Sequence, residues 1–211
     1  MRVLVLFATE EGQTEKIAQR IAENLITRGY PTDLHNIANQ TVSPVALDAY
    51  DAVVVGSPMH YSHYDAPLAE YLKQYKSDLR EIPSAFFSVS LGILSKEESE
   101  RAKIEQLTDT YLERVGWMPE IKWQFAGALS YSKYGWLKRH MMHWIAKKSG
   151  SDTDMRHDYE FTDWPKVDEF VEAFADFIES CKEPQEAHTR RSIYAQPKRR
   201  YSLKHRQAAN G

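Results

Sequence analysis

Short apolar runs alternate with longer amphipathic segments along this chain. The short runs have the hydrophobicity of β-strands, and they cover residues 2–8, 32–37, 51–57, 84–91 and 122–129. We expect Pro58 to end the third strand, because proline cannot donate a ladder hydrogen bond. Near-continuous apolar strands separated by helices are typical of a parallel sheet that is covered on both faces.

The longer segments repeat their apolar residues with the helical period. In residues 14–28 one face is apolar, and Gly29 ends the segment. A closing helix begins at Asp163, with Pro165 in its first turn. Apolar positions also mark helices over 68–75, 104–115 and 167–178. The pattern predicts an α/β fold, a doubly wound five-stranded parallel sheet of order 2-1-3-4-5, whose ligands bind at the carboxyl ends of the strands.

Two segments depart from this alternation. Residues 130–162 form a long insert before the last helix, too long for an ordinary connection. Residues 182–211 are polar and basic, which predicts a disordered tail after a single domain over 1–181. The N-terminus shows no secretory signal pattern, and no run of about 18 apolar residues predicts a membrane span.

Charge is distributed unevenly. The net charge is −3, yet residues 182–211 carry +6 and residues 133–148 carry +5, which leaves −14 for the remainder. Two basic segments on an acidic body indicate that these segments face something anionic. Cys181 is the one cysteine, which excludes a disulfide framework and a multi-cysteine metal site and fits a reducing compartment.

The turn after the first strand has the composition of a phosphate site. It reads Thr9-Glu10-Glu11-Gly12-Gln13-Thr14 and leads into a helix, whose first N–H groups attract anions. It matches neither the Walker A loop nor G-x-G-x-x-G. Since it lacks Lys and Arg, it suits a phosphate held by neutral donors, as in flavin mononucleotide (FMN) sites. The alternative is a plain capping turn without a ligand.

Residues 2–180 resemble the flavodoxin family, whose phosphate-binding signature matches the T-x-E-G-Q-T turn. The resemblance implies a flavodoxin-like fold, an FMN cofactor and ring-binding loops after the third and fourth strands. We expect Tyr61 to stack on the flavin ring, with surface packing as the alternative. His60 and His63 are candidates to contact flavin or substrate, or are simply solvated. The expected flavin-binding residues are Thr9, Glu10, Glu11, Gly12, Gln13, Thr14, Ser57, Pro58, Met59, His60, Tyr61, Ser88, Val89, Ser90, Leu91 and Gly92.

A closer resemblance is to the bacterial flavodoxin-type, quinone-dependent protoporphyrinogen IX dehydrogenases. It is carried by "LFATEEGQT", "YSHYDAPLAEYLKQY", "IPSAFFSVSL", "FAGALSYSKYGWLKRHMMHWIAKKSG" and "SDTDMRHDYEFTDW". It implies oxidation of protoporphyrinogen IX to protoporphyrin IX in haem biosynthesis, with menaquinone or ubiquinone as electron acceptor. It also implies a peripheral location on the cytoplasmic side of the inner membrane and is compatible with a homo-oligomer. We assign no catalytic residue and no metal.

The insert contains a second amphipathic pattern. Read as a helix, residues 134–148 place Met141 and Trp144 on an apolar face and four Lys or Arg residues around the rest. A basic helix of this kind is typical of a membrane surface, and the alternative is a core-packing helix with a solvated cationic face. We expect the basic tail to add a second electrostatic contact with the membrane. The alternatives are that it keeps the chain soluble or binds RNA non-specifically. We expect no specific nucleic-acid partner.

Two other functions remain open on this fold. A flavodoxin-type electron carrier is disfavoured by the basic insert and tail, because carriers generally present an acidic face. An NAD(P)H:quinone reductase is disfavoured because the sequence shows no nicotinamide-binding signature.

Overall fold

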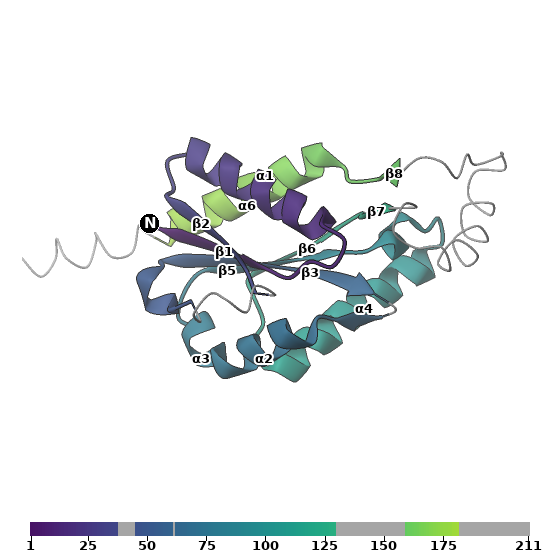
Figure 1. The fold of residues 1–211 in the computed structure, drawn as a ribbon, viewed down its shortest axis with the longest axis horizontal. Coiled ribbons are helices and arrows are strands. Elements are labelled where there is room, and N and C mark those ends of the chain that lie inside the picture. Colours follow the sequence, from purple (N-terminus) through teal and green to yellow (C-terminus); the bar gives the residue numbers. More distant parts are fainter. Residues whose placement is uncertain (38–44, 61, 130–158, 182–211) are drawn as a thin grey trace, which may run out of the picture.

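The computed structural model describes residues 1–37, 45–60, 62–129 and 159–181. Its centre is a parallel sheet in the order β2-β1-β3-β5-β6 (Figure 1). The five strands are β1 (Val3–Phe7), β2 (Thr32–Asn36), β3 (Ala52–His60), β5 (Ser84–Val89) and β6 (Ile121–Phe125). A two-residue strand, β4 (His63–Tyr64), pairs antiparallel with the end of β3. Counted along the chain, the parallel strands have the order 2-1-3-4-5, which confirms the predicted doubly wound fold.

Helices cover both faces of the sheet. In Figure 1, α1 (Gln13–Thr27) and α6 (Trp164–Ser180) lie on one face. The other face is covered by α2 (Ala66–Gln74), α3 (Lys76–Leu79) and α4 (Glu98–Val115). The apolar core therefore has two layers. Val3, Val5 and Phe7 pack toward α1 and α6, whereas Leu4 and Leu6 pack toward α2, α3 and α4, because side chains alternate along a strand.

The helix boundaries follow from local chemistry. Asp163 caps α6, its carboxylate accepting the Lys166 N–H at 3.4 Å. Asp65 caps α2 in the same way, accepting the Leu68 N–H at 2.9 Å. The predicted start of the last helix at Asp163, with Pro165 in the first turn, is confirmed.

The prediction that Pro58 ends the third strand is wrong, because β3 continues to His60. In β3 the Val53 N–H bonds toward β5, and the Gly56 carbonyl bonds toward β1. Since these directions alternate along a strand, the Pro58 nitrogen faces the β1 side. The pairing with β1 has already ended at Gly56. The missing N–H of Pro58 therefore lies where the β1–β3 ladder ends, while the pairing of β3 with β5 continues to Pro58 and Val89.

The predicted strand over 122–129 is divided in two. β6 ends at Phe125, where its pairing with β5 also ends. The chain then forms β7 (Ala128–Leu129), which pairs antiparallel with β8 (Tyr159–Glu160). The two ends of the insert therefore lie side by side. The predicted helix 134–148 and the tail 182–211 lie outside the described residues, as does Tyr61.

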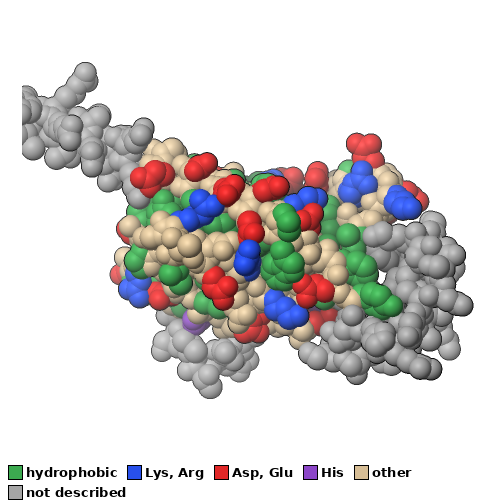
Figure 2. Space-filling view, turned by 90° about the horizontal axis from the view of Figure 1, so that it is seen from above, with side chains coloured by type: hydrophobic (Ala, Val, Ile, Leu, Met, Phe, Trp, Pro, Cys, Tyr) green, Lys and Arg blue, Asp and Glu red, His purple; other side chains and the backbone are tan. Residues whose placement is uncertain are grey.

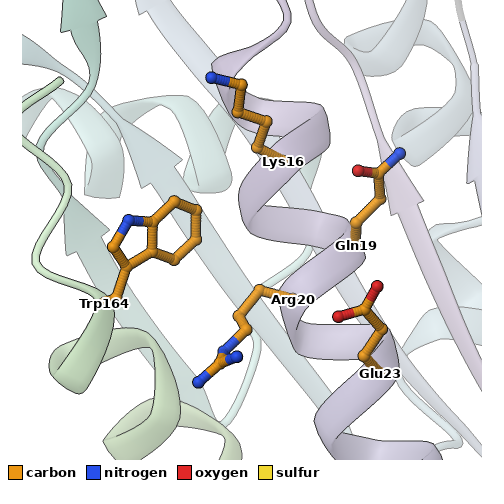
Figure 3. A pocket seen from close by; sticks show the side chains of 5 residues that line it. All are labelled: Lys16, Gln19, Arg20, Glu23 and Trp164. Carbon is orange, nitrogen blue, oxygen red and sulfur yellow. The ribbon is translucent and has the colours of Figure 1, made fainter. Parts of the chain in front are cut away.

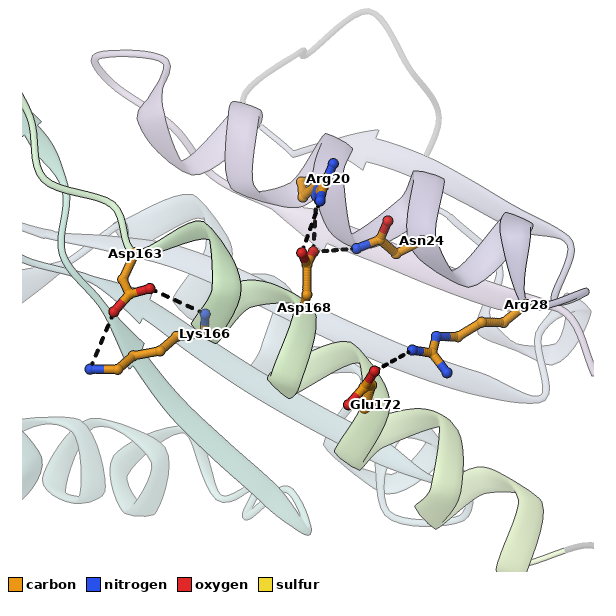
Figure 4. A network of polar contacts seen from close by, with 7 residues as sticks. All are labelled: Arg20, Asn24, Arg28, Asp163, Lys166, Asp168 and Glu172. Carbon is orange, nitrogen blue, oxygen red and sulfur yellow. Dashed lines mark hydrogen bonds and ion pairs between the residues drawn. The ribbon is translucent and has the colours of Figure 1, made fainter.

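A polar network joins α1 to α6 on the outer surface (Figure 4). The Arg20 guanidinium donates two hydrogen bonds to Asp168, at 2.9 and 2.8 Å. Asn24 donates to the same carboxylate, and Arg28 pairs with Glu172 at 2.9 Å. The hydrogen bond from Arg20 lowers the pKa of Asp168 below its ordinary value. Figure 2 looks onto this face, where acidic and basic side chains are interspersed among the described residues.

Candidate functional site

Three of the predicted segments meet at one edge of the sheet. In a parallel sheet the carboxyl ends of the strands lie together, and the turn after β1 therefore faces the ends of β3 and β5 (Figure 1). The register places Phe7 beside Gly56, and Ser57 beside Ser88. The structure thus brings the 9–14 turn to the same edge as residues 57–60 and 88–92.

The turn after β1 has the backbone of an anion cradle. Gly12 has φ 95° and ψ −9°, a conformation that L side chains rarely adopt. Its N–H donates to Thr9 Oγ1 at 3.0 Å, and its carbonyl accepts the Lys16 N–H at 3.1 Å. α1 begins at the next residue, so its first N–H groups lie at the turn without intrahelical partners. Hydroxyls from Thr9 and Thr14 complete a neutral donor set that fits a phosphate group.

Gln13 was expected to bind the flavin, but its side chain forms a hydrogen bond within the protein. Its side chain is buried, and its amide donates to Thr162 Oγ1 at 2.8 Å. The Thr162 hydroxyl in turn donates to the Ala126 carbonyl at 2.8 Å. This chain of contacts ties the turn to the end of β6. Thr162 was not singled out in the sequence analysis, because nothing in its local pattern indicates a partner 149 residues away.

The side chains of Ser57 and Ser88 are fully buried within the sheet. Ser57 Oγ lies 3.2 Å from the carbonyl of Pro58 and donates to it. Pro58 and Met59 continue β3, and Met59 is also buried. A ligand at this edge can therefore reach these residues mainly through the backbone.

The end of β3 folds back as a short hairpin. His60 pairs with His63, and Ser62 between them has a positive φ of 66°, which is uncommon for a residue other than glycine. Strained backbone of this kind is concentrated at functional sites. The hairpin meets the turn after β1, because His60 Nε2 lies 3.4 Å from Glu10 Oε2. Both side chains are partly exposed, so this contact lies at the rim of the site.

The loop after β5 is held by its own serine. Ser90 Oγ accepts the Gly92 N–H at 3.1 Å and caps the short 3₁₀ helix η2 (Leu91–Leu94). The Ser90 N–H donates to the Phe125 carbonyl at 3.0 Å, so the loop is fixed to β6. Gly92 lies against α4, since a Cβ at this position would be 2.8 Å from Ile104 Cδ1. The loop that we expect to contact the flavin ring is therefore held in place by β6 and α4.

A separate hollow lies on the outer side of α1, between α1 and Trp164 at the start of α6 (Figure 3). It has a volume of about 380 Å³ and is lined by Lys16, Gln19, Arg20, Glu23 and Trp164. Lys16 pairs with Glu160 at 3.4 Å, and Arg20 pairs with Asp168. Because both cations already meet carboxylates, this hollow lacks the charge that an anionic ligand would need.

The described part of the chain contains neither a cluster of metal ligands nor a membrane-spanning helix. No group of three or more His, Cys, Asp or Glu side chains gathers there as metal ligands would. No helix among the described residues is long and apolar enough to span a bilayer.

Comparisons with known proteins give the family. Residues 4–156 match the model of the flavodoxin domain. The chain is 34% identical over 175 residues to the protoporphyrinogen IX dehydrogenase [quinone] of Escherichia coli strain K12, covering 83% of this chain and 95% of the relative. It is 33% identical to the enzyme of the same name from Leishmania major, covering 82% of this chain and 74% of that one.

A solved structure agrees on the fold. A short-chain flavodoxin associated with a bacterial microcompartment superposes with a TM-score of 0.51 at 12% identity, covering 84% of this chain and 99% of the flavodoxin. The chain therefore belongs to the flavodoxin domain family and, within it, to the quinone-dependent protoporphyrinogen IX dehydrogenases.

Proposed function

We propose that this protein oxidises protoporphyrinogen IX to protoporphyrin IX with bound FMN and passes the electrons to menaquinone or ubiquinone. The observation that carries the proposal is the 34% identity to the Escherichia coli protoporphyrinogen IX dehydrogenase [quinone], which extends over 95% of that enzyme. A match over 175 of the 211 residues necessarily includes the insert 130–162. The reaction belongs to haem biosynthesis.

Membership of the flavodoxin domain family indicates that the cofactor is FMN. When bound, FMN supplies the redox chemistry, and the protein supplies binding, orientation and electrostatics. The turn from Thr9 to Thr14 holds the phosphate with hydroxyl and backbone donors. Residues 57–61 and 88–92 flank the ring, mainly through backbone groups, since Ser57 and Ser88 are buried. We keep Tyr61 as the residue proposed to stack on the ring.

Ionisable side chains at this edge are few in the described residues. Removal of six electrons and six protons from protoporphyrinogen requires proton acceptors close to the macrocycle. His60 and Glu10 lie at the rim of the proposed site, 3.4 Å apart. We assign neither a catalytic role, because the macrocycle nitrogens can also lose protons to water.

We also propose that the protein works at the cytoplasmic surface of the inner membrane. A lipid-soluble quinone and a hydrophobic macrocycle both favour that location. The support is the sequence of the insert helix 134–148 and the tail 182–211, whose Lys and Arg residues suit an anionic leaflet. Domain 1–181 would then carry the chemistry, and the basic segments would carry the attachment.

An anaerobic turnover assay tests the function. Purified protein, FMN, protoporphyrinogen IX and a soluble quinone are mixed, and protoporphyrin fluorescence is followed. We expect a quinone-dependent increase above the spontaneous rate. If the signal does not increase and NADPH reduces the bound flavin, the protein is a quinone reductase. If neither substrate reduces the flavin, it is an electron carrier.

A further inference from the structure

Three elements meet at one hydroxyl oxygen below the carboxyl edge of the sheet. Tyr64 comes from β4, Thr108 from α4 and Gln124 from β6. The Tyr64 hydroxyl lies 2.7 Å from Thr108 Oγ1, and Gln124 Nε2 lies 3.4 Å from the same oxygen. Thr108 is buried, so this junction is largely shielded from water.

The direction of each hydrogen bond follows from the chemistry of Thr108. A threonine hydroxyl has one hydrogen and two acceptor positions. The Thr108 hydroxyl donates its hydrogen to the Ile104 carbonyl at 2.9 Å. It must therefore accept from both Tyr64 and Gln124. Burial raises the pKa of Tyr64 to about 12, so the phenol keeps its proton and remains a donor. Tyr64 is a fixed hydrogen-bond donor at neutral pH, neither acid nor base.

Both loops that flank the proposed flavin ring contact one face of α4. Tyr64 belongs to the β3–β4 hairpin, where it pairs with Met59. The loop after β5 places Gly92 against the side chain of Ile104. Ile104 and Thr108 are four residues apart and hence lie on one face of the helix. α4 therefore contacts one loop through Ile104 and holds the other through Thr108.

We propose that Tyr64 is a positioning residue, whose hydrogen bond to Thr108 fixes the β3–β4 hairpin on α4 and so sets the spacing of the two loops around the flavin ring. This inference rests on the proposed flavin site. The phosphate turn after β1 has its own contacts, through Gly12, Gln13 and Thr162. Loss of the Tyr64 hydroxyl should therefore loosen the ring contacts while the phosphate stays held.

The test compares two tyrosine variants of the full chain. Tyr64→Phe removes the hydroxyl that bonds to Thr108 and also interacts with Ser88 on β5. Tyr71→Phe is the control, because the buried Tyr71 side chain likewise donates a hydrogen bond through its hydroxyl, to the Val45 carbonyl at 3.0 Å. That bond lies on α2 and before the start of β3, away from the proposed ring loops. For each variant we would measure the melting temperature without FMN, the FMN dissociation constant and the reduction potential of bound flavin.

We expect Tyr64→Phe to weaken FMN binding by about 2- to 10-fold, the range for one ordinary hydrogen bond. It should also shift the reduction potential, whereas Tyr71→Phe keeps both wild-type values and loses only stability. Thr108→Val should weaken FMN binding at least as much as Tyr64→Phe, because it removes the same contact and also the acceptor of the Gln124 amide. The double variant should lose less than the sum of the two single losses, because both single variants remove the Tyr64–Thr108 bond.

The proposal is overturned if Tyr64→Phe and Tyr71→Phe have the same FMN affinity and potential and differ from wild type only in melting temperature. Tyr64 would then be a structural residue, and the flavin site would stand. Wild-type protein that fails to bind FMN would overturn the proposed function, and this inference with it.

Discussion

At Gly12, in the proposed phosphate turn, an effect on FMN binding can be measured separately from an effect on the free energy of unfolding. Its φ is 95°, and no atom lies within 4 Å of the place where a Cβ would be. Gly12→Ala therefore meets backbone strain without a clash and should cost about 1–2 kcal/mol of unfolding free energy. Gly29 offers a matched control, with φ 88° and the same open surroundings at the end of α1. We expect both variants to lose similar stability in urea titrations and only Gly12→Ala to weaken FMN binding. Equal FMN affinity in the two variants would remove the turn from the site.

At Gly56 a substitution is limited by a steric clash rather than by backbone strain. A Cβ at Gly56 would lie 2.1 Å from the tip of the Phe87 ring, on the neighbouring strand. Gly56→Ala should therefore cost about 1–3 kcal/mol, the usual range for an overpacked core. Combining it with Phe87→Leu should recover part of the loss relative to the sum of the single variants, as measured by thermal unfolding. Additive losses would show that the ring is not the obstacle.

Residues whose role depends on local backbone conformation were predictable from the sequence. Side-chain hydrogen bonds between segments far apart in the sequence were not. Gly12 at the turn and Asp163 at the helix start follow from local propensity, and the structure has them where the sequence predicts. The contacts of Gln13 with Thr162 and of Tyr64 with Thr108 join segments 149 and 44 residues apart. Such pairs depend on how the elements pack, which one sequence does not reveal.

At the scale of elements, Asp168 on α6 accepts hydrogen bonds from both Arg20 and Asn24 on α1. The hydrogen bond from Arg20 lowers the pKa of Asp168, whose ordinary value is 3.8. A depressed pKa means that the folded state favours the charged carboxylate. The contribution to stability is therefore present above the unfolded pKa and is lost as pH falls through the folded pKa.

Asp168→Asn tests this contact. The variant should be modestly less stable than wild type at about pH 7, because exposed ion pairs contribute little. The difference between the two proteins should shrink progressively below about pH 4, because the unfolded chain takes up a proton there and the folded carboxylate follows at lower pH. Urea unfolding of both proteins at about pH 7 and below about pH 4 measures this difference in stability. Glu70→Gln, which removes an exposed pair with Lys73 on α2, serves as a control outside this contact. A difference that is independent of pH would indicate that Asp168 acts through packing.

Element order was predictable, but two strand ends were not. Pro58 was expected to end its strand, yet its nitrogen faces a side where β1 has already ended. The run 122–129 was read as one strand, yet it is shared between β6 and the short β7–β8 pair. In both cases the neighbouring strand, rather than the segment's own composition, decides where pairing stops.

At the scale of the whole molecule, charge divides the chain into an acidic body and two basic segments, which we propose attach it to the membrane. Removing residues 182–211 takes away +6 and changes the net charge from −3 to −9. α6 ends at Ser180, and its buried residues pack against the sheet. We therefore expect the variant 1–181 to keep the melting temperature and FMN affinity of the full chain. Binding to anionic vesicles should weaken, because each Lys or Arg near such a surface contributes about 1 kcal/mol.

Vesicle co-sedimentation tests whether the proposed membrane binding depends on charge. The full chain should bind vesicles with anionic lipid more tightly than neutral ones, and added salt should weaken that binding, because screening acts on exposed charges. The 1–181 variant retains the basic segment 133–148, so some salt-sensitive binding should remain. Replacing Lys138, Arg139, Lys147 and Lys148 by Gln in that variant should remove the rest. If the full chain binds neutral and anionic vesicles equally, charge does not attach this protein to the membrane, and the basic segments serve another purpose.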